Sequence, residues 1–478
     1  MKIYMVASES HPFIKTGGLA EVVYSLSREL QTEGNEVSIF IPYYKTIKDN
    51  PDVKPQKIKN YLVRLGWRQS SCDVYLQEVE GIRFFLIDGK YFSRDNCYGY
   101  DDDGERFAFF TLAVKELFYQ LLDIPDIVHC HDWHTGMLPC LIREDEYAKK
   151  HFAKTKFVFS IHNPAFQGLL EPSAVGDLYG LPYVLYDNGA VRLKNSVSTL
   201  KTGIMYADKI TTVSPNHRNE LLTSEGGMGL DGVLRLREYD FVGILNGIDF
   251  KEYNPHSDQY ISQPYSAVNF FQKKNENKLA LLQKLKIFSY GKPLFVFVSR
   301  LVWQKGLDIA FPALEEMAKL GCNVIILGSG ELRYQLWAED LRNRYPKNIA
   351  VYIGYKDSLA HEIYAAADFF LIPSLFEPCG IGQMIAQRYG TLPIVRRTGG
   401  LKDSVILYDG ANEDEANGFG FDWYSQDEIN RTCYFAYNTW NRIDVRKKLI
   451  KNAMKTDNSW KKSAQKYLEI YNTLINKK

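Results

Sequence analysis

Lys15 stands beside a pair of glycines where strand-like sequence gives way to helix-like sequence, in ESHPFIKTGGLAEVV (residues 9–23). A helix N-terminus presents unpaired N–H groups and the positive end of the helix dipole, and glycine lets its backbone approach an anion closely. Gly17 and Gly18 could therefore seat a phosphate next to the lysine charge. Because the spacing is neither GxGxxG nor a Walker A loop, a plain tight turn remains the alternative.

Two further cations, Arg300 and Lys305, lie in FVSRLVWQKGLDI (297–309), in the loop after a strand-like run and just before a helix-like one. Two cations about 4 Å from a phosphate oxygen are each worth roughly 4 kcal/mol at an effective dielectric near 20. Such a pair could clamp a departing diphosphate without a metal ion. The alternative is a pair of ordinary solvated side chains.

One carboxylate stands beside a turn rich in free amides in SLFEPCGIGQM (374–384). Glu377 is followed by the amides of Cys379, Gly380 and Ile381. A carboxylate next to such donors can bind sugar hydroxyls. The alternative is an ordinary first-turn acid that the helix dipole favours.

A histidine-rich stretch, HCHDWH (129–134), invites a metal-binding interpretation. The metallohydrolase pattern HxHxDH needs an acid where Trp133 stands, and Asp132 lies one place early. The triplet Asp101–Asp103 matches a DxD metal–nucleotide motif, but it lies in a loop rich in tyrosine and glycine. We therefore predict no metal site, and we interpret the triplet as an acidic loop tip.

His162 ends another strand-like run, in FSIHNPAFQG (159–168). A single histidine is often structural. Its place at the end of a strand leaves a catalytic role open beside the structural one.

Strand-like and helix-like runs alternate in two series along the chain. In the first, an apolar run at residues 2–7 precedes a helical pattern that ends near Gly34, and further strand-like runs follow. The second series starts after residue 290 and holds five strand-like runs separated by helix-length segments. This alternation is typical of parallel sheets with helices on both faces. We therefore predict an α/β fold with two Rossmann-like, doubly wound domains.

We place the N-terminal domain at residues 1–245 and the C-terminal domain at 246–460, because the sequence between the two series is rich in Gly, Asn and Pro. An amphipathic helix at 461–478 could pack back on the N-terminal domain. The stretch RRTGGLKDSV (396–405) repeats the TGGL of the first domain, which fits two related units. Ligands of open parallel sheets bind at the carboxyl ends of the strands, so we expect the site in a central cleft that both domains face.

Composition excludes several classes of function. A formal net charge of +1 over 478 residues gives no general attraction to nucleic acid or membrane. The seven cysteines are scattered and contain no CxxC pair, which argues against a disulfide framework or zinc ribbon and favours a reducing compartment. The chain shows no leader-like start and no apolar run of membrane-spanning length, so we expect a cytoplasmic protein.

Eight motifs occur in an order that closely resembles bacterial glycogen synthase and plant starch synthase. They are KTGGLAEVV, HCHDWHTG, FSIHNPAFQG, TTVSPNH, GILNGID, SRLVWQKGLD, FEPCGIGQ and RRTGGLKDSV. The resemblance covers nearly the whole chain and implies a retaining glucosyltransferase of the GT-B fold. The implied reaction transfers glucose from ADP-glucose to the non-reducing end of an α-1,4-glucan such as glycogen, with no cofactor and no metal.

The resemblance also implies a role for each motif. Lys15 and Gly18 would contact the donor diphosphate from the N-terminal domain, and Arg300 and Lys305 would grip it from the C-terminal domain. The residues implied to hold the sugar and the base are Glu377 with the amides of Cys379, Gly380 and Ile381 (glucose hydroxyls), His162 (beside the sugar ring), Asp132 and Asn246 (lining the same pocket) and Tyr355 (stacked on the base).

The implied mechanism agrees with the residue chemistry. If the leaving diphosphate itself directs the acceptor, the protein needs cations on the phosphates and a shaped sugar pocket. It needs no opposed pair of catalytic acids, whereas a glycosidase does. The sequence offers no such pair.

Three positions depart from the family pattern. Gly382 stands where Thr or Ser is usual, which removes a hydroxyl near the phosphates, and Glu21 replaces the usual Asp. Pro164 replaces an apolar residue after the His-Asn pair.

Rival functions remain. A transferase that uses UDP-glucose would stack uracil on Tyr355 as readily as adenine, so only the resemblance favours ADP-glucose. A non-catalytic glucan-binding protein could share the fold. The retained site residues argue against it, namely Lys15, Arg300, Lys305, Glu377 and His162. A nicotinamide dehydrogenase would need a GxGxxG followed by an acid about 20 residues later, which is missing.

Overall fold

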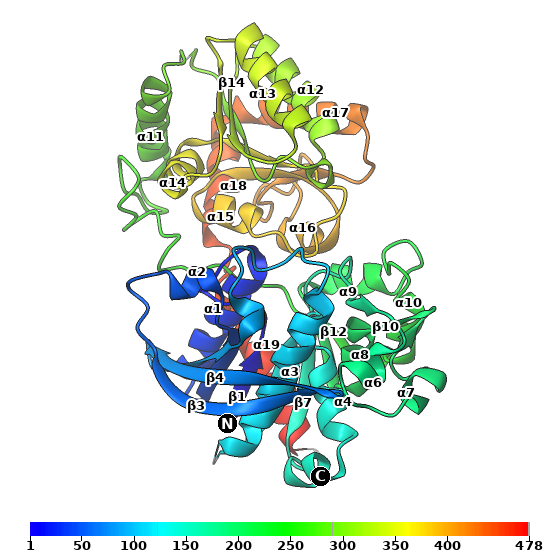
Figure 1. The fold of residues 1–478 in the computed structure, drawn as a ribbon. Helices are drawn as coiled ribbons and strands as arrows, with labels where there is room; N and C mark the ends of the chain where they lie inside the picture. The colour runs from blue at the N-terminus through cyan, green and yellow to red at the C-terminus, as the bar shows by residue number, and fades with distance from the viewer. Residues whose placement is uncertain (122, 289, 477–478) are drawn as a thin grey trace. The chain divides into compact units, whose positions relative to one another are not determined.

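The computed structural model describes residues 1–121, 123–288 and 290–476. The chain divides into two compact units (Figure 1). The first unit comprises Met1–Ile244 together with Trp460–Lys478, and the second comprises Leu245–Ser459. Helix α19 (Trp460–Asn476) belongs to the first unit and packs against α1 (Gly18–Thr32).

The first unit is built on a nine-stranded sheet. Seven adjacent strands are parallel, and β4 and β3 extend the β5 edge as an antiparallel pair. In spatial order the strands are β12 (Phe241–Gly243), β11 (Lys209–Thr212), β7 (Lys156–Ile161), β6 (Ile127–His131), β1 (Lys2–Val6), β2 (Glu36–Pro42), β5 (Ile82–Asp88), β4 (Arg68–Val79) and β3 (Gln56–Leu65).

Helices cover both faces of this sheet. His129 of β6 pairs in register with Met5 of β1 and hydrogen-bonds Tyr471 of α19, so both side chains face α19. Successive strand residues point to opposite faces, so Tyr4 faces the other way, where its ring lies 5.2 Å from that of Phe118 in α3 (Asp103–Gln120). Because the central strands are covered on both faces, their sequences are nearly continuous apolar runs.

The second unit holds a six-stranded sheet in which every pairing is parallel. Its spatial order is β15 (Ile349–Ile353), β14 (Asn323–Gly328), β13 (Leu294–Val298), β16 (Phe369–Ile372), β17 (Leu392–Arg396) and β18 (Phe419–Phe421). The helices that matter for the site are α12 (Leu307–Lys319), α14 (Asp357–Ala366), α15 (Gly382–Arg388) and α16 (Gly399–Ser404). The predicted α/β class with parallel sheets in both halves is confirmed.

The parallel order brings the chemistry-bearing loops to defined sheet edges within each unit. In the first unit, the loops after β1, β6 and β7 carry the Lys15, Asp132 and His162 motifs. In the second unit, the loops after β13, β15 and β16 carry Arg300 with Lys305, Tyr355 and Glu377. These are the carboxyl ends of parallel strands, where ligands of such sheets bind.

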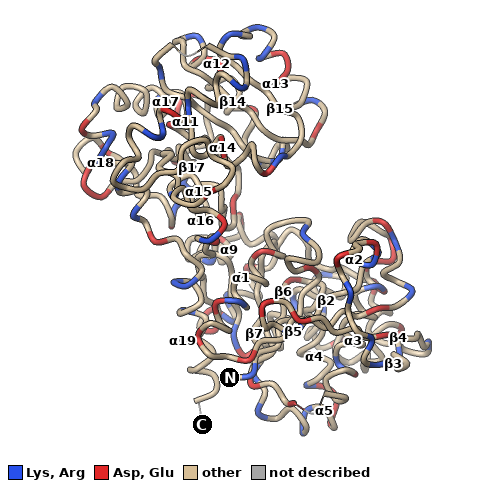
Figure 2. Tube along the Cα trace, turned by 90° about the vertical axis from the view of Figure 1, so that its left-hand side faces the viewer, with Lys and Arg blue, Asp and Glu red and all other residues tan. Residues whose placement is uncertain are grey.

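Basic and acidic residues are interspersed along the chain in both units (Figure 2), as the balanced composition leads one to expect. Among the described helices, none combines the length and apolar character needed to cross a bilayer.

Candidate active site

The loop after β1 is held by two buried acids. Thr16 donates from its backbone N (2.5 Å) and its hydroxyl (3.1 Å) to Glu9, which is almost fully buried. Lys15 donates from Nζ to Glu21 Oε2 at 3.0 Å, and its side chain remains 50% exposed. The lysine is thus oriented by α1 while its charge stays accessible to a ligand.

Gly17 and Gly18 lie at the start of α1, and neither is required by packing. A Cβ added at either position would meet no heavy atom within 4 Å, and Gly17 has the extended φ of −156° that any residue adopts. The N-cap residue, Gly17, has no side chain that could cap this helix start. The two glycines therefore leave the first amides of a 15-residue helix open to an approaching group.

Asp132 and His162 are brought together at the ends of β6 and β7. Asp132 has a left-handed φ of 56° and is buried, and its Oδ1 accepts from the backbone N of His162 at 2.7 Å. Burial raises the pKa of Asp132 to about 7, and nearby Glu9 adds to this. Burial lowers the pKa of His162 to about 4, so its imidazole is neutral at neutral pH.

The histidines of HCHDWH form a stacked and hydrogen-bonded group. The rings of His129 and His131 stack at 4.2 Å, and His131 Nδ1 lies 3.0 Å from His162 Nε2. His129 bonds the hydroxyls of Tyr471 and Ser160, each at 2.7 Å. Burial lowers the pKa of His129 to about 3 and that of His131 well below its usual range. His129 thus links β6 to α19 and to β7, so the histidines of HCHDWH have a structural role.

The acidic triplet is anchored by arginines. Asp102 pairs with Arg94 through two contacts of 2.5 and 2.6 Å, and Asp103 pairs with Arg106. Asp103 also accepts from the backbone N of Gly99 at 2.8 Å, at the start of α3. These contacts hold the loop before α3.

In the second unit, Lys305 and Glu377 form an ion pair. Lys305 Nζ lies 2.6 Å from Glu377 Oε2, and the two side chains are only 14% and 12% exposed. Ser374 donates its hydroxyl to the same oxygen at 2.9 Å. Arg300 is exposed and makes no side-chain hydrogen bond or ion pair within the described ranges.

The turn that carries Glu377 rests on the second TGG stretch. Gly399 has φ 45°, and a Cβ there would lie 2.0 Å from the carbonyl O of Glu377. A Cβ on Gly400 would lie 2.2 Å from the carbonyl O of Cys379, and Gly400 N donates to Glu377 O at 3.2 Å. The TGGL echo thus has a different use here from that in the first unit. It is a close backbone contact that positions the Glu377 turn, and sequence reasoning missed it.

Gly380 and Cys379 complete this turn. Gly380 has φ 70°, and the Cys379 thiol is buried, which raises its pKa to about 12. Ile381 and Gly382 then open α15. A Cβ on Gly382 would lie 3.0 and 3.2 Å from two ring carbons of Phe370, so the hydroxyl residue of the family pattern would require this ring to shift by a few tenths of an ångström.

Asn246 and Tyr355 are also in the second unit. The backbone of Asn246 lies close enough to the Cys379 thiol to offset part of the rise in its pKa, and the buried side-chain Oδ1 of Asn246 has no hydrogen-bond partner among the described residues. Asn246 therefore belongs with the Glu377 turn. Tyr355 follows β15, is 67% exposed, and donates its hydroxyl to Asp357 at 3.1 Å.

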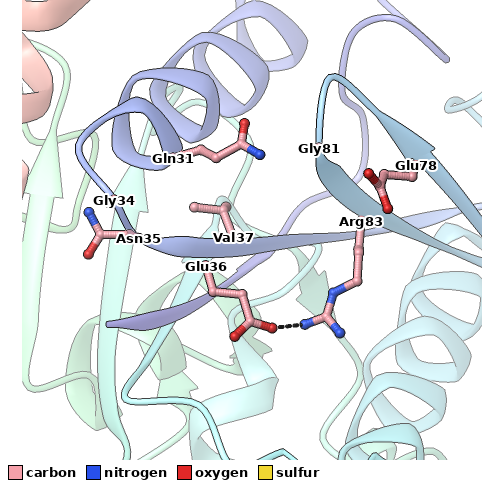
Figure 3. A pocket seen from close by; sticks show the side chains of 8 residues that line it. All are labelled: Gln31, Gly34, Asn35, Glu36, Val37, Glu78, Gly81 and Arg83. Carbon is pink, nitrogen blue, oxygen red and sulfur yellow. Dashed lines mark hydrogen bonds and ion pairs between the residues drawn. The ribbon is translucent and has the colours of Figure 1, made fainter.

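A cavity of about 520 Å³ lies in the first unit (Figure 3). Glu36 begins β2 and forms an ion pair with Arg83 of β5 at 2.5 Å across this cavity. These are the amino ends of parallel strands, the edge opposite the loops described above. None of the predicted site residues lines the cavity.

Sequence comparisons cover both units. Residues 2–236 match the family model described as "Starch synthase catalytic domain", and residues 273–456 match "Glycosyl transferases group 1". The chain is 43% identical over 477 residues to the glycogen synthase of Clostridium kluyveri, covering 99% of this chain and 100% of that relative. It is 40% identical to the glycogen synthase of Geobacillus stearothermophilus, covering 100% and 98% of the two chains.

Two solved structures superpose on nearly the whole chain. The catalytic domain of starch synthase IV from Arabidopsis thaliana, bound to ADP and acarbose, superposes with a TM-score of 0.91 at 33% identity, covering 99% of each chain. Sucrose-phosphate synthase from Thermosynechococcus elongatus gives a TM-score of 0.62 at 15% identity, covering 99% of this chain and 98% of its own, which supports the fold alone.

Proposed function

Because the chain belongs to the glycogen synthase and starch synthase family of glycosyltransferases, we propose that it transfers glucose from ADP-glucose to the non-reducing end of an α-1,4-glucan, with retention of configuration. The glycosyltransferase class and the glycogen synthase function follow from the relatives. The choice of ADP-glucose, the residue roles and the stereochemistry are the proposed part.

The arrangement around Lys305 and Glu377 is the main support for the proposed residue roles. The ion pair fixes both side chains, and the exposed Arg300 stands in the loop that leads to Lys305. We assign Arg300 and Lys305 to the donor diphosphate, where fixed cations stabilise charge that develops on the leaving group. We assign Glu377 and the amides of Cys379, Gly380 and Ile381 to the glucose hydroxyls.

Asn246 and Tyr355 complete the proposed donor site of the second unit. The buried amide oxygen of Asn246 has no hydrogen-bond partner among the described residues, which fits a polar contact to substrate. The exposed ring of Tyr355 offers a flat face for a nucleotide base.

The first unit supplies a second group of proposed contacts. Lys15 and the amides at Gly17 and Gly18 are assigned to the diphosphate, because the lysine charge is accessible and the helix start is open. The neutral imidazole of His162 and the side chain of Asp132 are assigned to the sugar. A neutral imidazole can donate or accept a hydrogen bond to a hydroxyl without opposing a positively charged sugar in the transition state.

We propose that this chemistry needs no metal and no cofactor, because the three cationic side chains of Lys15, Arg300 and Lys305 are assigned to the diphosphate. We further propose a cytoplasmic location. The seven cysteines are all free and buried, which fits a reducing compartment.

The test is a donor comparison. Purified protein is incubated with glycogen and either ADP-glucose or UDP-glucose, and the released nucleotide is measured. We expect kcat/KM to be higher with ADP-glucose. A higher kcat/KM with UDP-glucose would show that the protein is the UDP-glucose-dependent transferase. If neither donor released nucleotide and the protein still bound glycogen, a glucan-binding protein would be favoured.

A further inference from the structure

A group of three potential metal ligands lies in the second unit, outside the proposed sugar and diphosphate contacts. Glu252, Asp357 and His361 each offer one ligand atom, and these atoms all lie within 4.8 Å of one another. Asp357 and His361 are one turn apart on α14, so their side chains lie on the same face of that helix. Glu252 approaches from the segment between β12 and α11 (Phe270–Lys284).

His361 is the buried member of this group and is held in one orientation. Its side chain is 2% exposed, and its Nδ1 lies 2.8 Å from Asp258 Oδ2. The same carboxylate accepts from the Tyr389 hydroxyl at 2.5 Å. A carboxylate on Nδ1 keeps the proton there and leaves the lone pair on Nε2, the arrangement found behind metal-binding histidines.

The free end of this imidazole points into the carboxylates. His361 Nε2 is buried and has no hydrogen-bond partner among the described residues, and Asp357 Oδ2 lies 3.9 Å from it. A buried polar atom without a partner costs about 1–3 kcal/mol. Here the atom faces two carboxylates at a separation too long for a hydrogen bond, which leaves room for an ion between them.

We propose that Glu252, Asp357 and His361 bind a divalent metal ion of the zinc class, with Asp258 as the carboxylate that orients the histidine. An imidazole nitrogen favours zinc over magnesium or calcium, and two carboxylates neutralise the double charge. Glu252 and Asp357 are exposed, so they can move the short distance needed to reach ligand distances of roughly 2.0–2.2 Å. Solvent supplies the remaining ligand.

The proposed metal site adjoins the residue assigned to the nucleotide base. Asp357 Oδ1 accepts from the Tyr355 hydroxyl, while Oδ2 faces His361. The site shares no residue with the diphosphate and sugar contacts. We therefore assign the ion a structural role in holding the start of α14, independent of the transfer reaction.

The test uses the full chain after treatment with a chelator and removal of the chelator. Zn²⁺ is titrated by calorimetry, and Co²⁺ is titrated by visible absorption, which reports nitrogen and oxygen ligation directly. We expect saturable binding at one site and a higher melting temperature with Zn²⁺, because binding to the native state stabilises it. Glu252→Gln and Asp357→Asn should each weaken binding by about tenfold or more.

Matched controls are available on the same unit. His256→Gln changes an exposed histidine of the Glu252 segment, and Asp427→Asn changes an exposed first-turn acid on another helix, α17 (Gln426–Trp440). Both should bind Zn²⁺ as the parent does. His361→Gln could disturb folding, so the two exposed carboxylates carry the test, with circular dichroism confirming their fold. Absence of saturable binding by the parent, or unchanged binding in both carboxylate variants, would show that the group is only an ion cluster around His361.

Discussion

Lys305 and Glu377 cannot be substituted independently. The two side chains form a pair at 2.6 Å with little exposure, so removing one leaves a largely buried charge without its partner. Such a loss is strongly destabilising on its own. A fall in activity on substitution at either position would therefore mix lost substrate contact with a disturbed turn. Lys15 is the better probe of the proposed diphosphate contacts, because half of its side chain is exposed, although its partner Glu21 is buried.

We predict that Lys15→Ala lowers kcat by about 10²–10³, the scale of one preorganised electrostatic donor. Lys15 should act mainly on the leaving group as its charge grows, so the dissociation constant of ADP-glucose should change much less. The melting temperature should also fall, because the variant leaves the buried carboxylate of Glu21 without its lysine partner, so the fold of the variant is checked by circular dichroism. The measurement compares kcat with donor affinity, and Lys149→Ala, an exposed lysine on α5 (Glu146–His151), is the control. A kcat within about threefold of the parent, less than 1 kcal/mol of barrier, would make Lys15 a solvated turn residue.

At the scale of elements, the two TGGL stretches show how one sequence pattern serves two purposes. At Gly399 the backbone is left-handed and packs on the Glu377 carbonyl, so glycine is needed for the fold. At Gly17 the backbone is extended and the space around it is open, so the fold does not require glycine. The difference depends on whether another segment packs against the glycine, as the Glu377 turn does at Gly399. A local sequence match does not reveal this.

We predict opposite effects for alanine at these two positions. Gly399→Ala should lower the melting temperature by roughly 5–10 °C, because it adds a left-handed alanine and a clash with backbone. Gly17→Ala should leave the melting temperature nearly unchanged and lower kcat, because a methyl group would obstruct approach to the α1 amides. Thermal unfolding and initial rates distinguish the two. A Gly17→Ala variant with full activity would remove the argument for a ligand at this helix start.

At the scale of the whole molecule, the apolar runs predicted the core strands well. The five runs after residue 290 became β13 to β17, because strands covered on both faces must be apolar throughout. The antiparallel pair β3 and β4 was not predicted, since its strands are only partly buried and mix polar with apolar residues. The site motifs were found at strand ends. The Lys305–Glu377 pair and the support from Gly399 were not predictable, because they join segments far apart in the sequence.

The buried histidines of the first unit predict acid sensitivity. Burial lowers the pKa of His129 and His134 to about 3 and that of His162 to about 4. Between about pH 4 and 6.5 the unfolded chain therefore binds more protons than the native one, so stability falls as pH decreases through this window and is retained above it. Each buried histidine lowers the free energy of unfolding by roughly 2 kcal/mol at about pH 5. Asp132 has a raised pKa, so the native state binds the extra proton at this group, and its contribution to stability decreases as pH rises. This single group opposes the combined effect of the three histidines.

We predict that the melting temperature falls steeply from about pH 7.5 to about pH 5, and less steeply in His134→Phe, which removes one of these groups. The ring centroid of His134 lies 4.5 Å from that of Phe107 and 4.2 Å from that of Trp133, so an aromatic replacement suits the site. His151→Phe changes an exposed histidine and should leave the slope as it is. If the melting temperature changes with pH equally in the parent and in His134→Phe, His134 is protonated in the native state as readily as in the unfolded chain.

In the proposed mechanism, side-chain cations stabilise the diphosphate that leaves ADP-glucose, without a metal. The most direct measurement is the rate of glucose transfer from ADP-glucose to glycogen in the presence of EDTA, with the metal-free state checked by elemental analysis. We expect kcat in EDTA to stay within about threefold of the untreated value, a difference of less than 1 kcal/mol in barrier. Loss of transfer in EDTA, restored by Mn²⁺ or Mg²⁺, would contradict it.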